Sequence, residues 1–476
     1  MTTENDNFSK GRSTLLSRRD VFFIALAFSI VASFYLLPPL DGLTHSGQVM
    51  IGILFMAAIL WITEPIPLAV TGLMIMIAQP MLGVIPAVDV FSSFGNQAVF
   101  FLIGAFIISG AIEKHGLHRR MAFMFLRHFE KNPRIFTLGI MFSCALLSFV
   151  MPEHGVAALF LPIIVSILIA MKLVPRKSNF GKVSMLCVAY GCSIGSLGTL
   201  IGGARNPLTI GVLSDIGITV TFFDWMKYSM PIVFIALPLV WLVLQFSFPI
   251  EIKDVTMAKK EIDNQLAIAG KMGRSEVLVL VILVFTVLMW IFFSSFPYLG
   301  LAVIAILGGI LLFLTGCISW KDVEKRVPWG IILLYGGAIT LGMGMQSTGA
   351  GEWIAHLLFN TVGINPYLVI LGLIVFTIFL TEAMSNIAAV AILLPIGIAI
   401  STEIPGVSPL LASMCIALSG GLAFMLVIAT PGNAITYSSG YFSTRDLFKA
   451  GSVSNVICIL VVFTVAVFYW KGILGL

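Results

Sequence analysis

Long apolar runs separated by short polar segments make up most of this chain, and they predict membrane-spanning helices. Apolar runs cover 21–37, 48–63, 98–112, 230–248, 277–294, 298–316 and 453–470, and further runs start after 64–67 and at 329. An α-helix needs roughly 20 apolar residues to cross a hydrocarbon core, and it satisfies its own backbone hydrogen bonds in lipid. The pattern predicts an all-α polytopic membrane protein with about 11 transmembrane helices.

Two further pairs of apolar runs are interrupted by polar residues, which predicts re-entrant hairpins. The interruptions are residues 152–154, here called the first tip, and residues 385–387, the second tip. Arg134 and Lys172 flank the first pair of runs, so the positive-inside rule puts both flanks in the cytoplasm. A hairpin broken at the first tip fits these charges, although two full crossings fit them equally well.

Two other stretches have the composition of unwound helices. Glycine and proline interrupt the apolar region 183–212, and a second glycine-rich stretch covers 418–437. Transporters place their binding sites at helices that are interrupted in this way. Both stretches are therefore candidate parts of a ligand site.

The order of elements repeats along the chain. The spacing from Gly104 to His154 equals that from Gly336 to Asn386, and Asn206 matches Asn433. A repeat that contains one re-entrant hairpin has an odd number of crossings, so the two repeats would be inverted relative to each other. The predicted division is a cytoplasmic N-terminal tail (1–20), a first transmembrane helix and loop (21–47), a first inverted repeat (48–250), a cytoplasmic linker (251–275) and a second inverted repeat (276–476).

The basic residues give this topology an orientation. With both hairpins re-entrant, Lys227 and Lys471 lie outside, Arg205 lies within the membrane, and the other lysines and arginines face the cytoplasm. We expect a multi-pass protein of the plasma or inner membrane, with its N-terminus in the cytoplasm and its C-terminus outside.

Composition excludes several function classes. The mean hydropathy is +1.06, charged residues make up 10% of the chain and the net charge is +5, with the basic residues confined to loops. Nucleic acid is therefore not an expected partner, whereas the lipid bilayer is. The six cysteines are isolated and the histidines form no metal-binding motif, so we do not predict an enzyme.

A polar island inside the apolar run 379–395 is the strongest candidate site. It contains Thr381, Glu382, Ser385 and Asn386, and polar groups at this depth require internal partners or a ligand. Ser385 and Asn386 could instead only satisfy a helix break. Glu382 is either a proton or cation site or, as we favour, a carboxylate that accepts hydrogen bonds from nearby groups.

Four motifs give the chain a family resemblance. The segments Thr381-Glu-Ala-Met-Ser-Asn386, Ala429-Thr-Pro-Gly-Asn433, Gly198-Thr-Leu-Ile-Gly202 and Trp61-Ile-Thr-Glu-Pro-Ile-Pro67 resemble the divalent anion:sodium symporter family. That family transports dicarboxylates, citrate and sulfate. The resemblance covers residues 48–470 and implies a homodimer, with a fixed scaffold and a moving transport domain in each protomer.

The resemblance also implies roles for individual residues. In the second repeat, a sodium ion would be held by Thr381, Ser385, Asn386 and the Ala429 carbonyl, and the substrate would face Ser385, Asn386, Thr430 and Pro431, with Asn433 beside them. Ser148 and Gly202 are the candidate sodium ligands of the first repeat. Ile387 stands where the family has a threonine, which removes one hydroxyl from the pocket.

The first repeat departs from the family pattern because Glu153, His154 and Arg205 bring ionisable groups to it. Three interpretations are open, and all three make these residues candidate substrate-site residues. Arg205 pairs with Glu153 and takes over the electrostatic role of the first sodium; or Glu153 or His154 titrates and couples transport to protons; or Arg205 contacts the anion directly.

Together these features predict a secondary active transporter of a small divalent anion, with a C4-dicarboxylate favoured, coupled to sodium by elevator-type alternating access. Half-helix termini directed at an anion and carbonyls freed by unwinding suit this chemistry. The alternatives are proton-coupled transport or exchange of a dicarboxylate, tricarboxylate or sulfate, and a non-concentrative anion channel or receptor.

Overall fold

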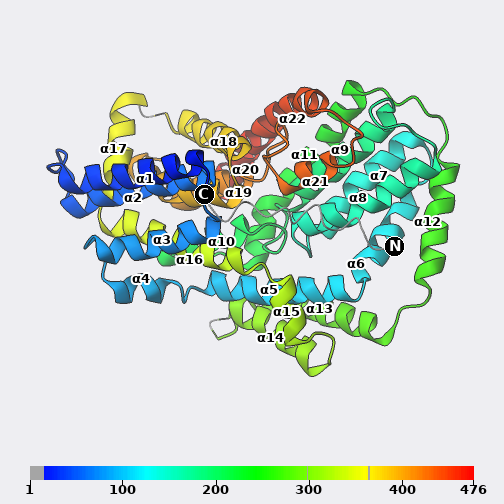
Figure 1. Cartoon of the computed structure of the whole chain (residues 1–476), viewed down its shortest axis with the longest axis horizontal. Coiled ribbons are helices and arrows are strands. Elements are labelled where there is room, and N and C mark those ends of the chain that lie inside the picture. Colours follow the sequence, from blue (N-terminus) through cyan, green and yellow to red (C-terminus); the bar gives the residue numbers. More distant parts are fainter. Residues whose placement is uncertain (1–15, 297, 363–364) are drawn as a thin grey trace.

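The protein is built from α-helices, and Figure 1 shows their arrangement in the computed structural model. The structure describes residues 16–296, 298–362 and 365–476, with the backbone only for 358–362. The first helices are α1 (Arg18–Leu36), α2 (His45–Thr63), α3 (Leu68–Met81), α4 (Ala87–Ser93), α5 (Gln97–Lys114), α6 (Leu117–Leu126), η1 (Arg127–Phe129), α7 (Pro133–Leu147), α8 (Glu153–Ala170), α9 (Asn179–Gly195), α10 (Arg205–Asp215) and α11 (Phe222–Ser247).

A linker helix, α12 (Thr256–Ala269), precedes the remaining helices. These are α13 (Arg274–Phe293), α14 (Leu301–Leu314), α15 (Trp320–Arg326), α16 (Trp329–Ser347), α17 (Ala350–Val362), α18 (Pro366–Ala383), α19 (Asn386–Glu403), α20 (Pro409–Ser419), α21 (Pro431–Tyr437), α22 (Thr444–Thr464) and the π-helical η2 (Val465–Lys471). Ten helices of the described residues are long and apolar enough to cross a membrane, and four shorter apolar helices accompany them. The predicted all-helical, multi-span class is confirmed.

Helices that are distant in the sequence pair closely with one another. Helix α5 packs along α14 and α3 packs along α16, as Figure 1 shows. At Gly104 on α5, a Cβ atom would lie only 2.4 Å from the Ala305 carbonyl carbon on α14, so the glycine permits the close approach. An ion pair between Lys114 and Asp322, 2.8 Å apart, joins the end of α5 to α15 and holds the pKa of the Asp322 carboxyl well below its usual range.

Two helices begin earlier than their apolar runs predict. Helix α11 begins at Phe222 instead of about 230, and α22 begins at Thr444 instead of about 453. Both starts are fixed by capping boxes, Thr221 with Asp224 and Ser443 with Asp446, in which side chain and backbone satisfy each other's hydrogen bonds. The polar first turns therefore belong to the helices, although hydropathy alone assigns them to loops.

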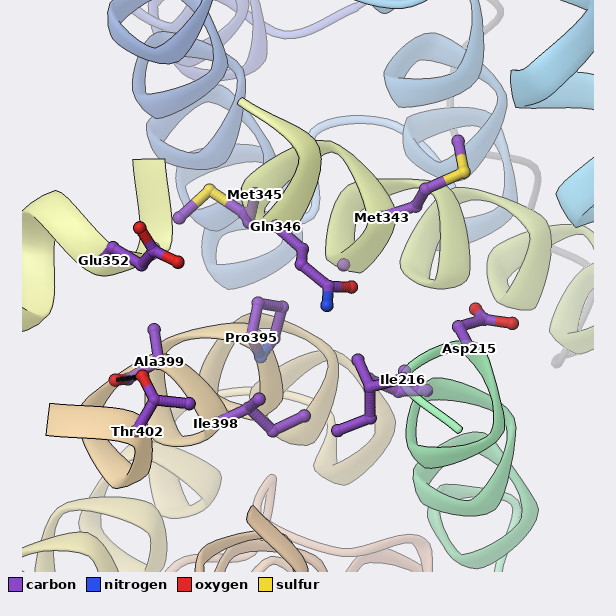
Figure 2. Close-up of a pocket in the computed structure, with 13 residues that line it drawn as sticks. Asp215, Ile216, Met343, Met345, Gln346, Glu352, Pro395, Ile398, Ala399 and Thr402 are labelled. Atoms are coloured by element: carbon purple, nitrogen blue, oxygen red, sulfur yellow. Dashed lines mark hydrogen bonds between the residues drawn. The ribbon is translucent and has the colours of Figure 1, made fainter. Parts of the chain in front are cut away.

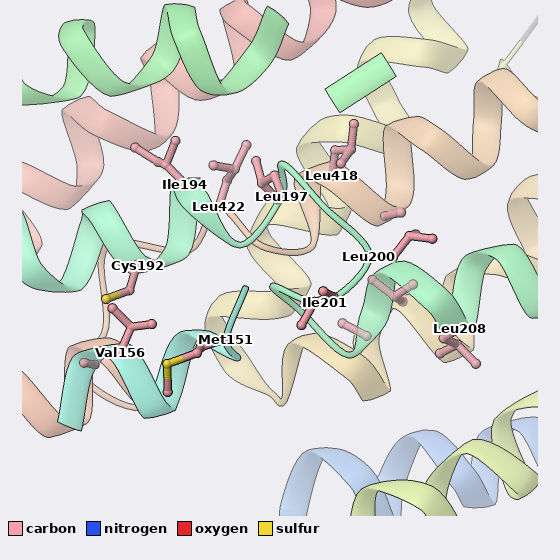
Figure 3. Close-up of a cluster of buried hydrophobic side chains, with 14 of the residues drawn as sticks. Met151, Val156, Cys192, Ile194, Leu197, Leu200, Ile201, Leu208, Leu418 and Leu422 are labelled. Atoms are coloured by element: carbon pink, nitrogen blue, oxygen red, sulfur yellow. The ribbon is translucent and has the colours of Figure 1, made fainter. Parts of the chain in front are cut away.

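The predicted interruptions are present as helix breaks. Residues 196–204 separate α9 from α10, and residues 420–430 separate α20 from α21; we call these segments the first break and the second break. Helix α8 begins at Glu153 in the first tip, and α19 begins at Asn386 in the second tip. Buried leucines of the two breaks and their flanks share one apolar cluster, in which Figure 3 shows Leu197, Leu200, Leu418 and Leu422. This apolar packing holds both breaks inside the molecule.

Candidate functional site

A cavity of about 550 Å³ lies where both tips and both breaks meet. One wall consists of the two tips together with residues from the breaks and the helix starts that follow them. The opposite wall is formed by residues from around the starts of α3 and α16 and from the middle of α5. The lining residues from the tips and breaks include Glu153, His154, Gly202, Arg205, Ser385, Asn386, Ile387, Ala429, Thr430 and Pro431. The structure thus brings most of the predicted site residues into one cavity.

Several helices begin at this cavity. They include α8, α10 and α19, whose first residues Glu153, Arg205 and Asn386 line it. Neither α8 nor α19 has a side-chain hydrogen bond at its N-cap, and α10 also lacks one among the described residues. Unsatisfied backbone N–H groups and the helix dipoles make such ends favourable for a negative charge.

Oxygen atoms from three segments gather beside the second tip. The Thr381 hydroxyl oxygen lies 2.6 Å from Asn386 Oδ1 and 3.1 Å from the Gly420 carbonyl oxygen. All three residues are buried. Neutral side-chain oxygens together with a carbonyl freed by a helix break are the ligands that transporters offer to sodium, so these residues fit a sodium ion. Sequence reasoning missed Gly420, which only its place in the glycine-rich stretch could have suggested.

The first tip carries charged groups in place of these neutral oxygens. The Arg205 guanidinium donates a hydrogen bond to Ser196 Oγ at 2.7 Å, and its Nη1 lies 3.8 Å from Glu153 Oε2. The Gly202 carbonyl, a predicted sodium ligand, accepts a hydrogen bond from the Glu153 backbone N–H at 3.1 Å. Ser148 Oγ, the other predicted ligand, is buried without a hydrogen-bond partner among the described residues. The positive charge of Arg205 disfavours a sodium ion beside it.

Asn386 joins the two tips. Its Nδ2 donates to Glu153 Oε1 at 3.5 Å, while its Oδ1 faces Thr381. One chain of polar contacts therefore runs from Arg205 through Glu153 and Asn386 to Thr381. Ser196, the remaining partner of Arg205, was not predicted; its place shortly before the Gly198–Gly202 motif was the available signal.

Two asparagines hold the two breaks in the same way. Asn206 Nδ2 donates to the carbonyls of Ser196 and Thr199, at 2.8 and 2.7 Å. Asn433 Nδ2 donates to the carbonyls at 423 and 426, at 3.2 and 2.9 Å. In both cases the carbonyls belong to the residues ten and seven positions earlier. Asn433, predicted beside the substrate, is fully buried, and its amide supports the second break.

Glu382 stabilises the second break. Its carboxylate accepts hydrogen bonds from the backbone N–H groups of Met425 and Leu426, at 2.8 and 2.9 Å, and from Asn455 Nδ2 at 2.7 Å. A carboxylate with three donors is well satisfied without a ligand. The favoured interpretation of Glu382 is confirmed.

A second, smaller cavity of about 80 Å³ lies between α16, α17, α19 and α10. Figure 2 shows Gln346 of α16 directed into the space above Pro395 of α19, with Asp215 at the end of α10 nearby. It is lined mainly by apolar side chains and contains none of the predicted site residues. No three His, Cys, Asp or Glu side chains among the described residues are grouped to hold a metal ion.

Comparisons with known proteins agree with the motifs. Residues 19–476 match the family described as the sodium:sulfate symporter transmembrane region. The chain is 30% identical over 463 residues to the sodium-dependent dicarboxylate transporter SdcS of Staphylococcus aureus, covering 92% of this chain and 88% of that protein. It is 29% identical over 464 residues to an uncharacterized transporter of Haemophilus influenzae, covering 94% and 97%.

Solved structures share the fold at low sequence identity. MtrF of Neisseria gonorrhoeae matches with a TM-score of 0.59 and 12% identity, covering 95% of this chain and 94% of that one. The YdaH transporter of Alcanivorax borkumensis matches with a TM-score of 0.55 and 14% identity, covering 80% and 88%. The resemblance predicted from the motifs is confirmed: this multi-pass membrane chain belongs to the sodium:sulfate symporter family and is, by family, a sodium-coupled anion transporter, not an enzyme.

Proposed function

We propose that the protein carries a C4-dicarboxylate across the membrane together with sodium. The observation that supports this most is that α8, α10 and α19 begin at a cavity lined by Asn386, whose Oδ1 meets the Thr381 hydroxyl, which in turn meets the Gly420 carbonyl. The helix ends favour the anion, the oxygens favour the cation, and a bound cation lowers the cost of burying the anion's charge. The dicarboxylate named for the Staphylococcus relatives is consistent with this choice.

Within this proposal, the residues at and beside the second tip bind both the sodium ion and the substrate. Thr381, Asn386 and the Gly420 carbonyl hold sodium, with Ser385 and the Ala429 carbonyl as further ligands. Ser385, Asn386, Thr430 and Pro431 face one carboxylate of the substrate, and His154 at the first tip lines the same cavity. Asn433 acts indirectly, by keeping the second break in shape.

Transport would follow an elevator mechanism. The tips and breaks move as one body against α3, α5 and α16, whose cavity-facing residues, among them Leu68, Phe106 and Leu334, are mostly apolar and can slide. We further propose that α7–α8 and α18–α19 are re-entrant hairpins in two inverted repeats, 48–250 and 276–476, with the N-terminus inside, the C-terminus outside and two chains per assembly.

The moving boundary can be tested by cross-linking. Asn96 caps α5, and its Nδ2 donates to Asp215 Oδ1 of α10 at 2.9 Å. A short thiol cross-linker that joins the pair Asn96→Cys and Asp215→Cys should stop uptake, while either single variant stays active. Uptake that continues in the cross-linked protein contradicts the proposed motion.

Uptake of labelled succinate into proteoliposomes tests the function itself. With sodium outside and potassium inside, we expect accumulation above the outside concentration, and none with potassium on both sides. Accumulation that depends on a proton gradient or on internal dicarboxylate, and is indifferent to sodium, would replace symport by one of the alternative couplings.

A further inference from the structure

Arg205 is a buried cation in a place that disfavours positive charge. It is 1% exposed and is the first residue of α10, where the helix dipole opposes a cation. Its Nε has no hydrogen-bond partner among the described residues, and its closest approach to Glu153 is 3.8 Å. Burying an arginine this way is costly, and a buried ion pair is weak grounds for a stabilising role. The residue is better explained by function.

The guanidinium also reaches the second break. A Cβ atom at Gly421 would lie 2.0 Å from Arg205 Nη2 and 2.4 Å from Cζ, so the guanidinium lies directly against the backbone at Gly421. The adjacent carbonyl, of Gly420, is the one that faces Thr381. Arg205 therefore lies between Glu153 of the first tip and the oxygens beside the second tip.

The chain itself shows what Arg205 replaces. In the fold the tips align one position away from the Gly104–Gly336 spacing, because Glu153 and Asn386 are each the first residue of a helix, α8 or α19, and each lies nine residues before a proline inside it. Arg205 and Gly432 each precede one of the two asparagines that hold the breaks. Where the second half has an amide oxygen and a glycine, the first half has a carboxylate and a guanidinium. Beside its tip, the first half therefore has a covalently attached cation that the second half lacks.

We propose that Arg205 is a tethered cation, which supplies at the first tip the positive charge that sodium supplies at the second, so that each protomer binds one sodium ion. The inference rests on the proposed sodium site at Thr381 and Asn386. Glu153 holds the guanidinium in place and, through Asn386, connects it to that site.

Equilibrium binding of radioactive sodium to the purified full-length protein in detergent measures the number of sodium ions bound per protomer, here called the count. It needs no substrate. We expect one ion per protomer at saturation. The double variant Glu153→Asn with Arg205→Gly gives the first half the residues of the second, and its count should rise to two. Arg205→Lys, which retains the charge, should stay at one.

A matched control removes an arginine of another ion pair. Arg120 lies 3.2 Å from Glu276, and neither residue lines the cavity. Arg120→Gly should leave the count at one. A wild-type count of two, or a folded double variant that still binds one, overturns the inference. If the double variant fails to elute as a single species, the wild-type count decides alone.

The outcomes separate this inference from the proposed function. A count of one without succinate uptake supports the tethered cation and removes the substrate assignment. A count of zero overturns the inference together with the proposed sodium site.

Discussion

The two tips occupy equivalent places in the fold but use different chemistry. Beside the second tip, Thr381 and Asn386 present neutral oxygens. At the first tip, Glu153 and Arg205 neutralise each other within the protein. On the assignment proposed above, the two halves share an architecture, while only the second has a site for a free ion.

The two breaks, unlike the two tips, are supported by the same kind of residue. Asn206 and Asn433 hold them through carbonyls at identical spacing, so the support is unchanged between the halves. The additional contacts differ: Thr199 donates to the Phe149 carbonyl at 2.7 Å in the first half, whereas Glu382 accepts two backbone N–H groups in the second. The asparagines that shape the backbone are the same in both halves, whereas the residues at the proposed ligand sites differ.

Asn386→Ala should have the largest effect. It removes an oxygen from the proposed sodium site and the link to Glu153, and contacts to charged groups are worth about 1.5–3 kcal/mol each. Sodium-driven succinate uptake should fall roughly 100-fold or more. Asn365→Ala, which removes an exposed helix cap of α18, is the matched control and should leave uptake within about twofold. Similar losses in both variants would mean that the second tip has no special role.

Glu382→Gln should destabilise the second break. An amide in place of the carboxylate turns one NH₂ group toward a backbone donor and leaves a buried N–H unsatisfied, at a cost of about 2–3 kcal/mol. The measurement is the thermal unfolding temperature in detergent, which should drop clearly. Glu403→Gln, at a partly exposed carboxylate paired with His356, should change it little. A stable Glu382→Gln protein that loses only its sodium dependence would instead make Glu382 a cation ligand.

Asn206→Ala and Asn433→Ala should be equally damaging to stability. Each removes two hydrogen bonds that hold carbonyls of a break, and each lost hydrogen bond costs about 1 kcal/mol. We expect about 2 kcal/mol from either variant, measured as the drop in unfolding temperature. A drop confined to one of them would break the equivalence of the two breaks.

Ile387→Thr should have the smallest effect. It adds to the second tip one hydroxyl that can donate to a substrate carboxylate, worth about 1 kcal/mol, so the KM for succinate should fall about fivefold. Ile331→Thr adds a hydroxyl on the opposite wall and should leave KM unchanged. An unaltered KM in Ile387→Thr would place the substrate away from this side chain.

Sequence patterns predicted the fold to the extent that hydropathy and chain breakers encode it. Apolar runs located the spans, and glycine and proline located both breaks. The capped starts of α11 and α22 were missed because their first turns are polar. The contact of Arg205 with Gly421 could not be predicted, since it joins residues more than 200 positions apart and depends on how the two breaks pack. The sequence showed that Glu153 and Arg205 are unusual. It could not decide which of the three interpretations applies, because that depends on which groups surround them.

The ion pair of the first tip has a consequence for the electrical work of transport. A tethered cation crosses with the moving body and returns with it, so it adds no net charge to a complete cycle. One sodium ion with one dianion then moves one negative charge inward, against about 2.3 kcal/mol per 100 mV of an inside-negative potential. The inward movement of one sodium ion down a tenfold gradient supplies only about 1.4 kcal/mol, which is less than this electrical cost at 100 mV. Across a membrane with an inside-negative potential, the single arginine would therefore limit how far the carrier accumulates its substrate, whereas vesicles without a potential impose no such limit.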